Sequence, residues 1–450
     1  MQVPVLAVLP SEGPLKEAAA AYLAGADHRD ALSAASIPSG VTLDSSFPAV
    51  PVGTHGAATN DAASLAPEAS QHFAVRGTVD VEHIGQVPTH ADGHPIFSDP
   101  VIAPFLTCGG TPPVGGTAEV AQQLKIAALA ARGLDGTKVA VAIMDTGINF
   151  AHLQAQPLSK NAFLDIANSW VAPGTTTTPG FHPVDHGTMC AYDVLIGAPK
   201  AALLDFPVLA PRAPGGALDG SVLSVAFKAY SQIMSSWAVA FDANGLSKYD
   251  ALIISNAWGI FHPNSDFPVG HPGRYIDNPK HPFNQMVGML ARSGADIIFA
   301  AGNCGSPCAD ISCAGLTTGT ITGANAMVDV LTLAGCDTTD QRVGYSSQGP
   351  SIANMFQNKP DVTAYTHFQG SLVSGATAPD SGTSAACSVA SGCVAALRTR
   401  LPPTATPSAS LFDQLRATAR RPPDVAAAGW NADYGFGIID PDAVAQHFGI

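Results

Sequence analysis

The stretch "KVAVAIMD", residues 138–145, decides the fold class. Between its charged ends every residue is apolar, and similar runs recur along the chain as "AALLDFPVL" (201–209), "ALIISNAW" (251–258), "ADIIFAAGN" (295–303) and "VDVLTLAGC" (328–336). Near-continuous apolar runs are typical of strands that are covered on both faces, as in parallel sheets. The sequence therefore predicts an α/β fold with a mostly parallel central sheet.

Segments with helical spacing alternate with these runs. "AEVAQQLKIAALAARG" (118–133) has apolar residues at helical period and ends at a glycine, and we expect further helices near 220–241, 283–293, 384–400 and 409–420. Alternation of this kind places helices on the faces of the sheet. Functional side chains are then expected where strands end.

The first 116 residues have a different composition. Residues 1–70 are rich in Ala, Ser, Pro and Gly, and they predict a flexible region apart from a short helix in "PLKEAAAAYLAG" (14–25). Residues 71–116 contain the strand-like "HFAVRGTVDVEHIG" (72–85) and end in a Gly/Pro linker, which favours an N-terminal extension or pro-segment. Residues 117–450 form the predicted main domain.

Composition limits the partners and the compartment. The formal net charge is −14 and no basic patch occurs, which excludes a nucleic-acid backbone as partner. No run reaches the ~18 apolar residues of a membrane-spanning helix, so no membrane partner is expected. The start "MQVPVLAVLPSEG" has no basic residue before its short apolar stretch, which favours a cytoplasmic protein, with secretion open if a leader has been removed.

Eight cysteines in 450 residues are too few for a disulfide scaffold. We expect most of them to be small, buried core residues. For the closely spaced Cys304, Cys308 and Cys313, free thiols are the first expectation, one loop disulfide the second, and a zinc site the third.

Three polar residues suggest chemistry. Asp145 ends an apolar run, His186 lies in "DHGTMCA" and Ser384 lies in "SGTSAAC". Singly, Asp145 is explained as a turn residue, His186 as a core histidine or a helix-start residue, and Ser384 as a helix N-cap. Together an acid, an imidazole and a hydroxyl are the parts of a hydrolytic triad, in the chain order of the subtilisin type.

The segments "VAVAIMDTGI" (139–148), "HGTMCA" (186–191), "FAAGN" (299–303) and "SGTSAAC" (381–387) resemble the signature segments of the subtilisin-like serine proteases, or subtilases. "VGYSSQGP" (343–350) and "YGFGIIDPDAV" (434–444) are similar to two further segments of that family. The resemblance covers roughly residues 117–447 and implies a three-layer subtilisin-like fold.

The resemblance implies a serine endopeptidase that works through an acyl-enzyme. Asp145, His186 and Ser384 would form the triad, while the Asn303 side chain and the Ser384 backbone N–H would stabilise the oxyanion. Without a triad, Asn303 is explained as a turn residue. A peptide ligase or transpeptidase on the same fold and a catalytically silent peptide-binding scaffold are the alternatives.

Substrate binding is implied by the same resemblance. Two segments would form the walls of the pocket for the residue before the cleaved bond and pair with an extended peptide; they comprise Asn256, Ala257, Trp258 and Gly259 in one segment and Ala300, Ala301 and Gly302 in the other. Protein or peptide substrates with an apolar residue before the cleaved bond are expected. The bulk of Trp258 predicts restricted subsites.

Several positions depart from the family pattern. Gln154 stands where calcium-binding relatives have an aspartate, so no cofactor or metal is expected, with a weak calcium site elsewhere left open. Cys190 is expected to be a buried core thiol near the imidazole. Ser388 replaces a proline, which predicts a looser turn at Ser384. The N-terminal segment would inhibit the enzyme before removal, with a mature start near residues 110–118, unless it stays attached.

Overall fold

The computed structural model describes residues 1–52, 67–104, 107–108, 111–171, 175, 177–209, 221–240, 248–422, 425 and 429–450. The chain divides into two compact units. Unit 1 comprises Met1–Val101, Val222–Ser247 and Pro263–Ser293, and unit 2 comprises Ile102–Ser221, Lys248–His262 and Gly294–Ile450. Within the described residues, no helix combines the length and the apolar character that crossing a membrane requires.

Unit 2 is built on a seven-stranded sheet in the order β16-β15-β14-β12-β8-β10-β9. Every pair of neighbouring strands in it is parallel. The strands are β8 (Val139–Asp145), β9 (Phe163–Leu164), β10 (Ala202–Pro207), β12 (Ala251–Asn256), β14 (Asp296–Ala300), β15 (Leu331–Cys336) and β16 (Val362–Tyr365). The central strands are buried along their whole length, as the apolar runs predict. The predicted α/β fold, a parallel central sheet flanked by helices, is confirmed.

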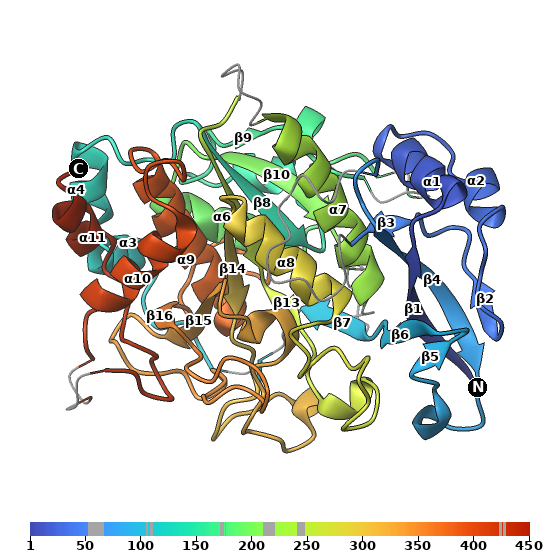
Figure 1. Ribbon diagram of the computed structural model, residues 1–450. Coiled ribbons are helices and arrows are strands. Elements are labelled where there is room, and N and C mark those ends of the chain that lie inside the picture. The colour runs from blue at the N-terminus through green and yellow to red at the C-terminus, as the bar shows by residue number, and fades with distance from the viewer. Residues whose placement is uncertain are drawn as a thin grey trace. The chain divides into compact units, whose positions relative to one another are not determined.

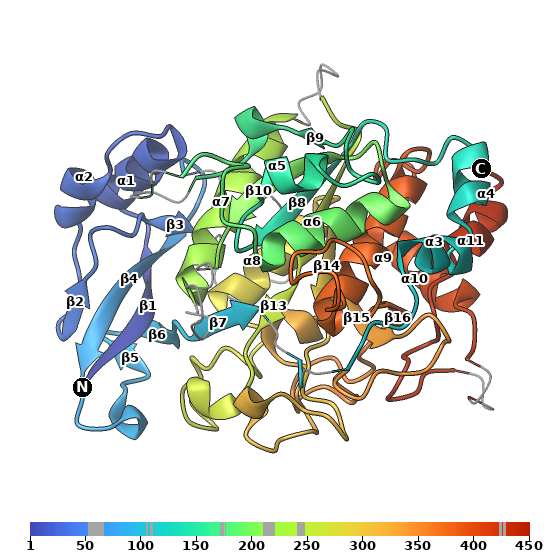
Figure 2. The ribbon, with the colours of Figure 1, turned by 180° about the vertical axis from the view of Figure 1, so that it is seen from behind.

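Two helices, α6 (His186–Gly197) and α9 (Gly382–Arg398), pack against each other and against this sheet (Figure 1). Figure 2 shows α6, in green, beside α9, in orange-red. Their approach is close, because a Cβ atom on Gly392 would lie 2.2 Å from the carbonyl oxygen of Val194. Helix α6 is absent from the sequence prediction, since a helix buried on almost every side lacks an amphipathic period.

Shorter helices complete unit 2. They are α3 (Thr117–Gln123), α4 (Ile126–Ala131), α5 (Phe150–Gln154), α10 (Ser408–Thr418) and α11 (Pro441–Phe448), with 3₁₀ turns η3 (Ile166–Asn168), η5 (Ile311–Cys313) and η6 (Gly323–Ala326). The single helix predicted over 118–133 is divided at Lys125, whose φ of 54° is left-handed. Two short strands, β7 (Val101–Pro104) and β13 (Trp258–Gly259), pair antiparallel, and β11 (Ser221–Val222) follows later in the chain.

Unit 1 contains a sheet in the order β2-β4-β1-β6-β5, with β3 also paired to β4. Its elements are β1 (Gln2–Pro10), α1 (Gly13–Leu23), α2 (Arg29–Ser33), β2 (Val41–Leu43), β3 (Val50–Pro51), β4 (His72–Asp80), η2 (Ile84–Gln86), β5 (His90–Ala91), β6 (His94–Ser98), α7 (Leu223–Ala240), η4 (Pro263–Ser265) and α8 (Pro282–Arg292). Strand β1 pairs antiparallel with β4 along nine residue pairs.

The flexible region predicted over residues 1–70 is wrong for residues 1–52, which form strands and helices with a core of their own. The alanines that suggested low order pack there, as Ala18 and Ala19 of α1 are fully buried. Residues 53–66 of that prediction lie outside the described residues. The first boundary between the units lies after residue 101, and two later segments of the chain, 222–247 and 263–293, again belong to unit 1. The observed units therefore differ from the predicted segments 1–70, 71–116 and 117–450.

Candidate active site

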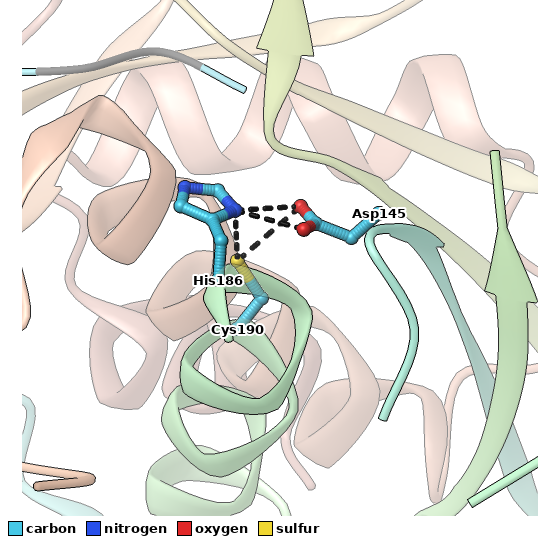
Figure 3. A group of neighbouring side chains, drawn as sticks. All are labelled: Asp145, His186 and Cys190. Atoms are coloured by element: carbon cyan, nitrogen blue, oxygen red, sulfur yellow. Dashed lines mark hydrogen bonds and ion pairs between the residues drawn. The ribbon is translucent and has the colours of Figure 1, made fainter. Parts of the chain in front are cut away.

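Asp145 and His186 meet at the carboxyl end of the sheet in unit 2. Asp145 is the last residue of β8 and His186 is the first residue of α6. The His186 Nδ1 atom lies 2.8 Å from Asp145 Oδ1 and 2.9 Å from Oδ2 (Figure 3). A carboxylate can only accept, so Nδ1 carries the proton and Nε2 is the nitrogen with a basic lone pair.

The carboxylate of Asp145 is completely buried. It also accepts a hydrogen bond from the backbone N–H of Thr146 at 2.7 Å, and the Thr146 hydroxyl accepts from the backbone N–H of Gly187 at 2.9 Å. A Cβ atom on Gly187 would lie 2.6 Å from the carbonyl oxygen of Gly147. Glycine after His186 therefore allows the strand end and the helix start to approach.

Ser384 lies in the first turn of α9 and is buried. Its hydroxyl donates to the carbonyl oxygen of Ala257 at 3.2 Å. The N-cap of α9 is Ser381, so the alternative explanation of Ser384 as an N-cap is wrong. Gly382 has a φ of 80°, which permits the sharp entry into the helix.

Asn303 follows β14 and is buried beside the same turn. Its Oδ1 atom accepts from the backbone N–H of Thr383 at 2.9 Å and from the Thr383 hydroxyl at 3.1 Å. These bonds fix the amide orientation, and a Cβ atom on Gly382 would lie 2.8 Å from Asn303 Nδ2. The amide nitrogen therefore lies at the start of α9.

The Cys190 thiol is a third neighbour of the Asp145–His186 pair. Its Sγ atom lies 3.7 Å from Asp145 Oδ2 and 3.7 Å from His186 Nδ1 (Figure 3). Within the described part of the chain, these three side chains are the one group of His, Cys, Asp or Glu close enough to bind a metal ion. Burial raises the pKa of the Cys190 thiol well above its usual value, and the charge of Asp145 raises it further, which disfavours the thiolate that metals prefer.

Comparison with protein families decides the identity. The model of the subtilase family (Peptidase S8) matches residues 136–437, more than half of the chain. The chain belongs to the subtilase family. It is therefore a serine-type endopeptidase, a hydrolase of peptide bonds, as the resemblance implied.

Among solved structures, this subtilase is similar to the crystal structure of MycP1 with the N-terminal propeptide removed. The sequence identity is 21%, the TM-score is 0.48, and the match covers 75% of this chain and 98% of the other. No curated protein sequence matches the chain.

The residues predicted to bind substrate differ in what their side chains contact. The Asn256 amide donates into the sheet, to the carbonyl oxygens of Ile254 at 3.1 Å and Ile298 at 3.2 Å. The Trp258 ring is buried and lies edge-on to Phe299, with ring centroids 5.5 Å apart. Trp258 therefore fills the interior of the subtilase.

One residue that joins the two predicted walls was missed in the sequence. The Asn325 amide donates to the carbonyl oxygens of Trp258 at 3.0 Å and Ala300 at 2.8 Å. The backbone carbonyl oxygen of Asn325 accepts from the Thr332 hydroxyl at 2.6 Å. Asn325 lies in the 3₁₀ turn η6 and belongs to none of the quoted motifs, so only the fold reveals its position.

Cysteines near Asn303 form disulfides, which corrects the first expectation of free thiols. Cys304 is bonded to Cys313, and Cys308 is bonded to Cys108. In the loop that the Cys304–Cys313 disulfide encloses, the backbone N–H of Asp310 donates to the backbone carbonyl oxygen of Asn303 at 3.0 Å. The remaining cysteines are free and buried, as expected of core residues; they are Cys190, Cys336, Cys387 and Cys393.

Ser388 lies beyond the first turn of α9, where its hydroxyl donates to the Ser384 carbonyl oxygen at 3.0 Å. This bond joins two consecutive turns of α9, and the looser turn expected from the missing proline stays a prediction. Gln154 is the exposed last residue of α5.

A second buried carboxyl group lies near Asp145. Asp205 of β10 accepts backbone N–H bonds from Ile148 at 3.2 Å and Gly180 at 2.8 Å. Burial raises the pKa of Asp205 to about 7, and the Nε2 atom of His182 lies 3.6 Å from its Oδ2 atom. The aspartate within the apolar run "AALLDFPVL" is the sequence signal that could have singled it out.

Proposed function

We propose that the subtilase cleaves peptide bonds through Asp145, His186 and Ser384 and an acyl-enzyme intermediate. The observation that carries this proposal is the contact of 2.8 Å between Asp145 and His186 Nδ1, which leaves Nε2 as a base. His186 takes the Ser384 proton as Oγ attacks the substrate carbonyl carbon, and it returns that proton to the leaving amine. Water then repeats the sequence on the acyl-serine ester and releases the second product.

The negative oxygen of the tetrahedral intermediate is stabilised by two donors. Asn303 Nδ2 is held at the start of α9 by the bonds of its oxygen to Thr383. The backbone N–H of Ser384 lies in the first turn of a 17-residue helix, where the helix dipole favours negative charge. Both donors are pre-oriented, so little reorganisation accompanies the reaction.

Substrate is bound as an additional strand on β13. The chain itself supplies a precedent, because Ala103 pairs antiparallel with Gly259 and Pro104 pairs with Trp258. As β7 advances from Ala103 to Pro104, it runs toward Ala257, whose carbonyl oxygen accepts from Ser384. An extended peptide recognised by its backbone fits this arrangement, and side-chain pockets add selectivity.

The same pairing supports self-inhibition. Residues 103–104 use the edge of β13 that a substrate strand needs, so the segment competes with substrate until it is cleaved and leaves. Cleavage is expected shortly after Pro104, upstream of the start near residues 110–118 that the sequence suggests. The disulfide from Cys108 to Cys308 would retain a new N-terminus that begins before Cys108.

Labelling with a fluorophosphonate, followed by peptide mapping, tests the triad. We expect modification of Ser384, and its loss in Ser384→Ala and in His186→Ala. Ser391→Ala is the matched control, because Ser391 is also buried in α9 and its hydroxyl donates to Cys387 within the helix. Folded protein that takes up no label would contradict the protease mechanism and favour the silent scaffold. Labelled protein that joins peptides rather than hydrolysing them would favour the ligase.

N-terminal sequencing of active protein tests the self-inhibition. We expect a new N-terminus between residues 105 and 109 in the wild-type chain and an intact chain in Ser384→Ala. A fully active chain that keeps residue 1 would contradict the proposal.

We further propose that catalysis requires no metal ion or other cofactor. The three catalytic groups suffice for the chemistry, and Gln154 is an exposed amide rather than an aspartate. Activity is expected to survive dialysis against a chelator.

An oxidising compartment is favoured over the cytoplasm. Two disulfides, Cys108–Cys308 and Cys304–Cys313, are typical of secreted or periplasmic proteins. We therefore propose the secreted alternative.

A further inference from the structure

Two buried carboxyl groups, Asp193 and Asp380, lie together between the elements that carry His186 and Ser384. Asp193 follows His186 by seven residues, about two helical turns, and therefore lies on the same side of α6. Asp380 precedes Ser384 by four residues. Asp193 is fully buried and Asp380 is 2% exposed, so solvent does not separate their charges.

The two carboxyl groups have unequal partners. Asp380 accepts the backbone N–H of Ser371 at 2.5 Å and the Ser371 hydroxyl at 2.6 Å. Within the described residues, neither oxygen of Asp193 receives any N–H or O–H donor. A buried carboxylate without a donor is very unfavourable, whereas a neutral acid can donate its own proton. Asp193 and Asp380 are within hydrogen-bonding reach of each other.

The proton therefore belongs on Asp193, and the ionised member is Asp380. Burial and the neighbouring charge of Asp380 raise the pKa of Asp193 well above its usual value. Burial also raises the pKa of Asp380, against the effect of its bonds to Ser371. Two neighbouring buried carboxyl groups cannot both ionise without strong repulsion.

Other charged groups near the pair do not supply a cation. Among the described residues, no lysine or arginine forms an ion pair with either aspartate, although the positive form of His152 would favour ionised Asp380. Helices α3, α5 and α9 and strand β8 contact α6. The titratable groups on α6 and these elements are Glu119, Asp145, His152, His186, Cys190, Tyr192, Cys387, Cys393 and Arg398, of which Arg398 is paired with Asp296.

We propose that Asp193 and Asp380 share one proton, and that this hydrogen bond positions the His186 helix against the turn that presents Ser384. The proposal rests on the catalytic roles of His186 and Ser384. Asp193 and Asp380 are positioning residues, since neither touches substrate. Gly370 makes room for the pair, because a Cβ atom there would lie 2.2 Å from Asp380 Oδ2. Loss of the shared proton at alkaline pH would leave two facing carboxylates and push the two elements apart.

Two substitutions of Asp193 test this role. Asp193→Asn keeps a donor toward Asp380 but cannot ionise, so we expect kcat within about threefold of wild type at neutral pH and a weaker loss of activity on the alkaline side. Asp193→Leu has similar bulk but no donor, and misplacement of the base is expected to lower kcat by about tenfold or more with little change in KM. Asp442→Asn, a buried aspartate on α11, is the control and should leave the pH profile unchanged.

Infrared spectroscopy detects the proton without an activity assay. At neutral pH the wild type should show the carbonyl stretch of a protonated carboxyl group that disappears in Asp193→Asn and persists in Asp442→Asn. A difference spectrum without this band overturns the proposal, even if Asp193→Leu does not fold. So does an Asp193→Asn pH profile identical to that of the wild type.

Labelling and infrared spectroscopy together distinguish a failure of the proposed protease mechanism from a failure of the positioning role. If the wild type takes up no fluorophosphonate at Ser384, the protease mechanism fails, whereas the infrared band still reports on the shared proton. If the wild type is labelled and the band is absent, only the positioning role is lost.

Discussion

Thr383 orients the Asn303 amide, because it donates to the amide oxygen through both its backbone N–H and its hydroxyl. An asparagine can present either end of its amide, and these two donors select which end faces the start of α9. The sequence identifies Asn303 through a motif. The motif does not reveal what turns the nitrogen toward Ser384, because Thr383 lies 80 residues away in the chain.

Asn303→Ala tests the proposed role of Asn303 as an oxyanion donor. Loss of one preoriented donor is expected to reduce kcat by about 100- to 1,000-fold while KM changes little. Steady-state kinetics on a peptide substrate measure both constants, and thermal unfolding checks that the fold persists. A folded variant with kcat within about threefold of wild type would contradict the assigned role.

Asp205 gives a pH dependence of stability. Its pKa is raised from 3.8 to about 7 in the folded state, so the native protein binds more protons than the unfolded chain between these values. The stabilisation is complete below pH 3.8 and is lost as pH rises toward about 7, with a slope of at most about 1.4 kcal/mol per pH unit. Asp205→Asn should remove this slope. Urea unfolding at several pH values measures it, and an unchanged slope would contradict the prediction.

At the scale of elements, the crossing of α6 and α9 brings together the two helices that carry His186 and Ser384. The two helices approach at Gly197 and Gly392, where backbone lies against backbone. The sequence shows that both positions are glycine. It does not show that they contact each other, because nearly 200 residues separate them. The buried α6 was also missed, because burial on all sides removes the periodicity that predicts a helix.

Gly392→Ala tests the crossing. The added methyl group would meet the Val194 carbonyl oxygen at 2.2 Å and must separate the helices. We expect a destabilisation of about 1–3 kcal/mol and a lower kcat, measured by urea unfolding and by kinetics. Gly13→Ala in α1 is the control, since nothing lies within 4 Å of its added methyl group. Unchanged stability of Gly392→Ala would contradict the packing.

At the scale of the whole chain, disulfides and strand pairing join distant segments. Cys108 and Cys308 are 200 residues apart, and β1 pairs with β4 across some 60 to 80 residues. Within unit 2, Pro104 pairs with Trp258 in the same way. Of these connections, the pairing of β1 with β4 involves the N-terminal region that composition predicts to be flexible, and it gives part of residues 1–52 an ordered structure.

Thiol titration tests the disulfides. Of eight cysteines, four are free and four are paired, so the unreduced protein unfolded in denaturant should react at four thiols. Reduction before titration should raise the number to eight. Eight reactive thiols without reduction would contradict both disulfides and restore the free-thiol expectation.

The sequence by itself determined the parallel α/β sheet and the subtilase family, because apolar strand runs and short motifs are local patterns. It also singled out Asp145, His186, Ser384 and Asn303 as candidates. Only the tertiary structure decided that Trp258 points into the core, that Asn325 joins the two predicted walls, and that Asp193 faces Asp380. Each of these depends on contacts between segments far apart in the chain, and such contacts arise from packing and burial, which no local pattern of residues encodes.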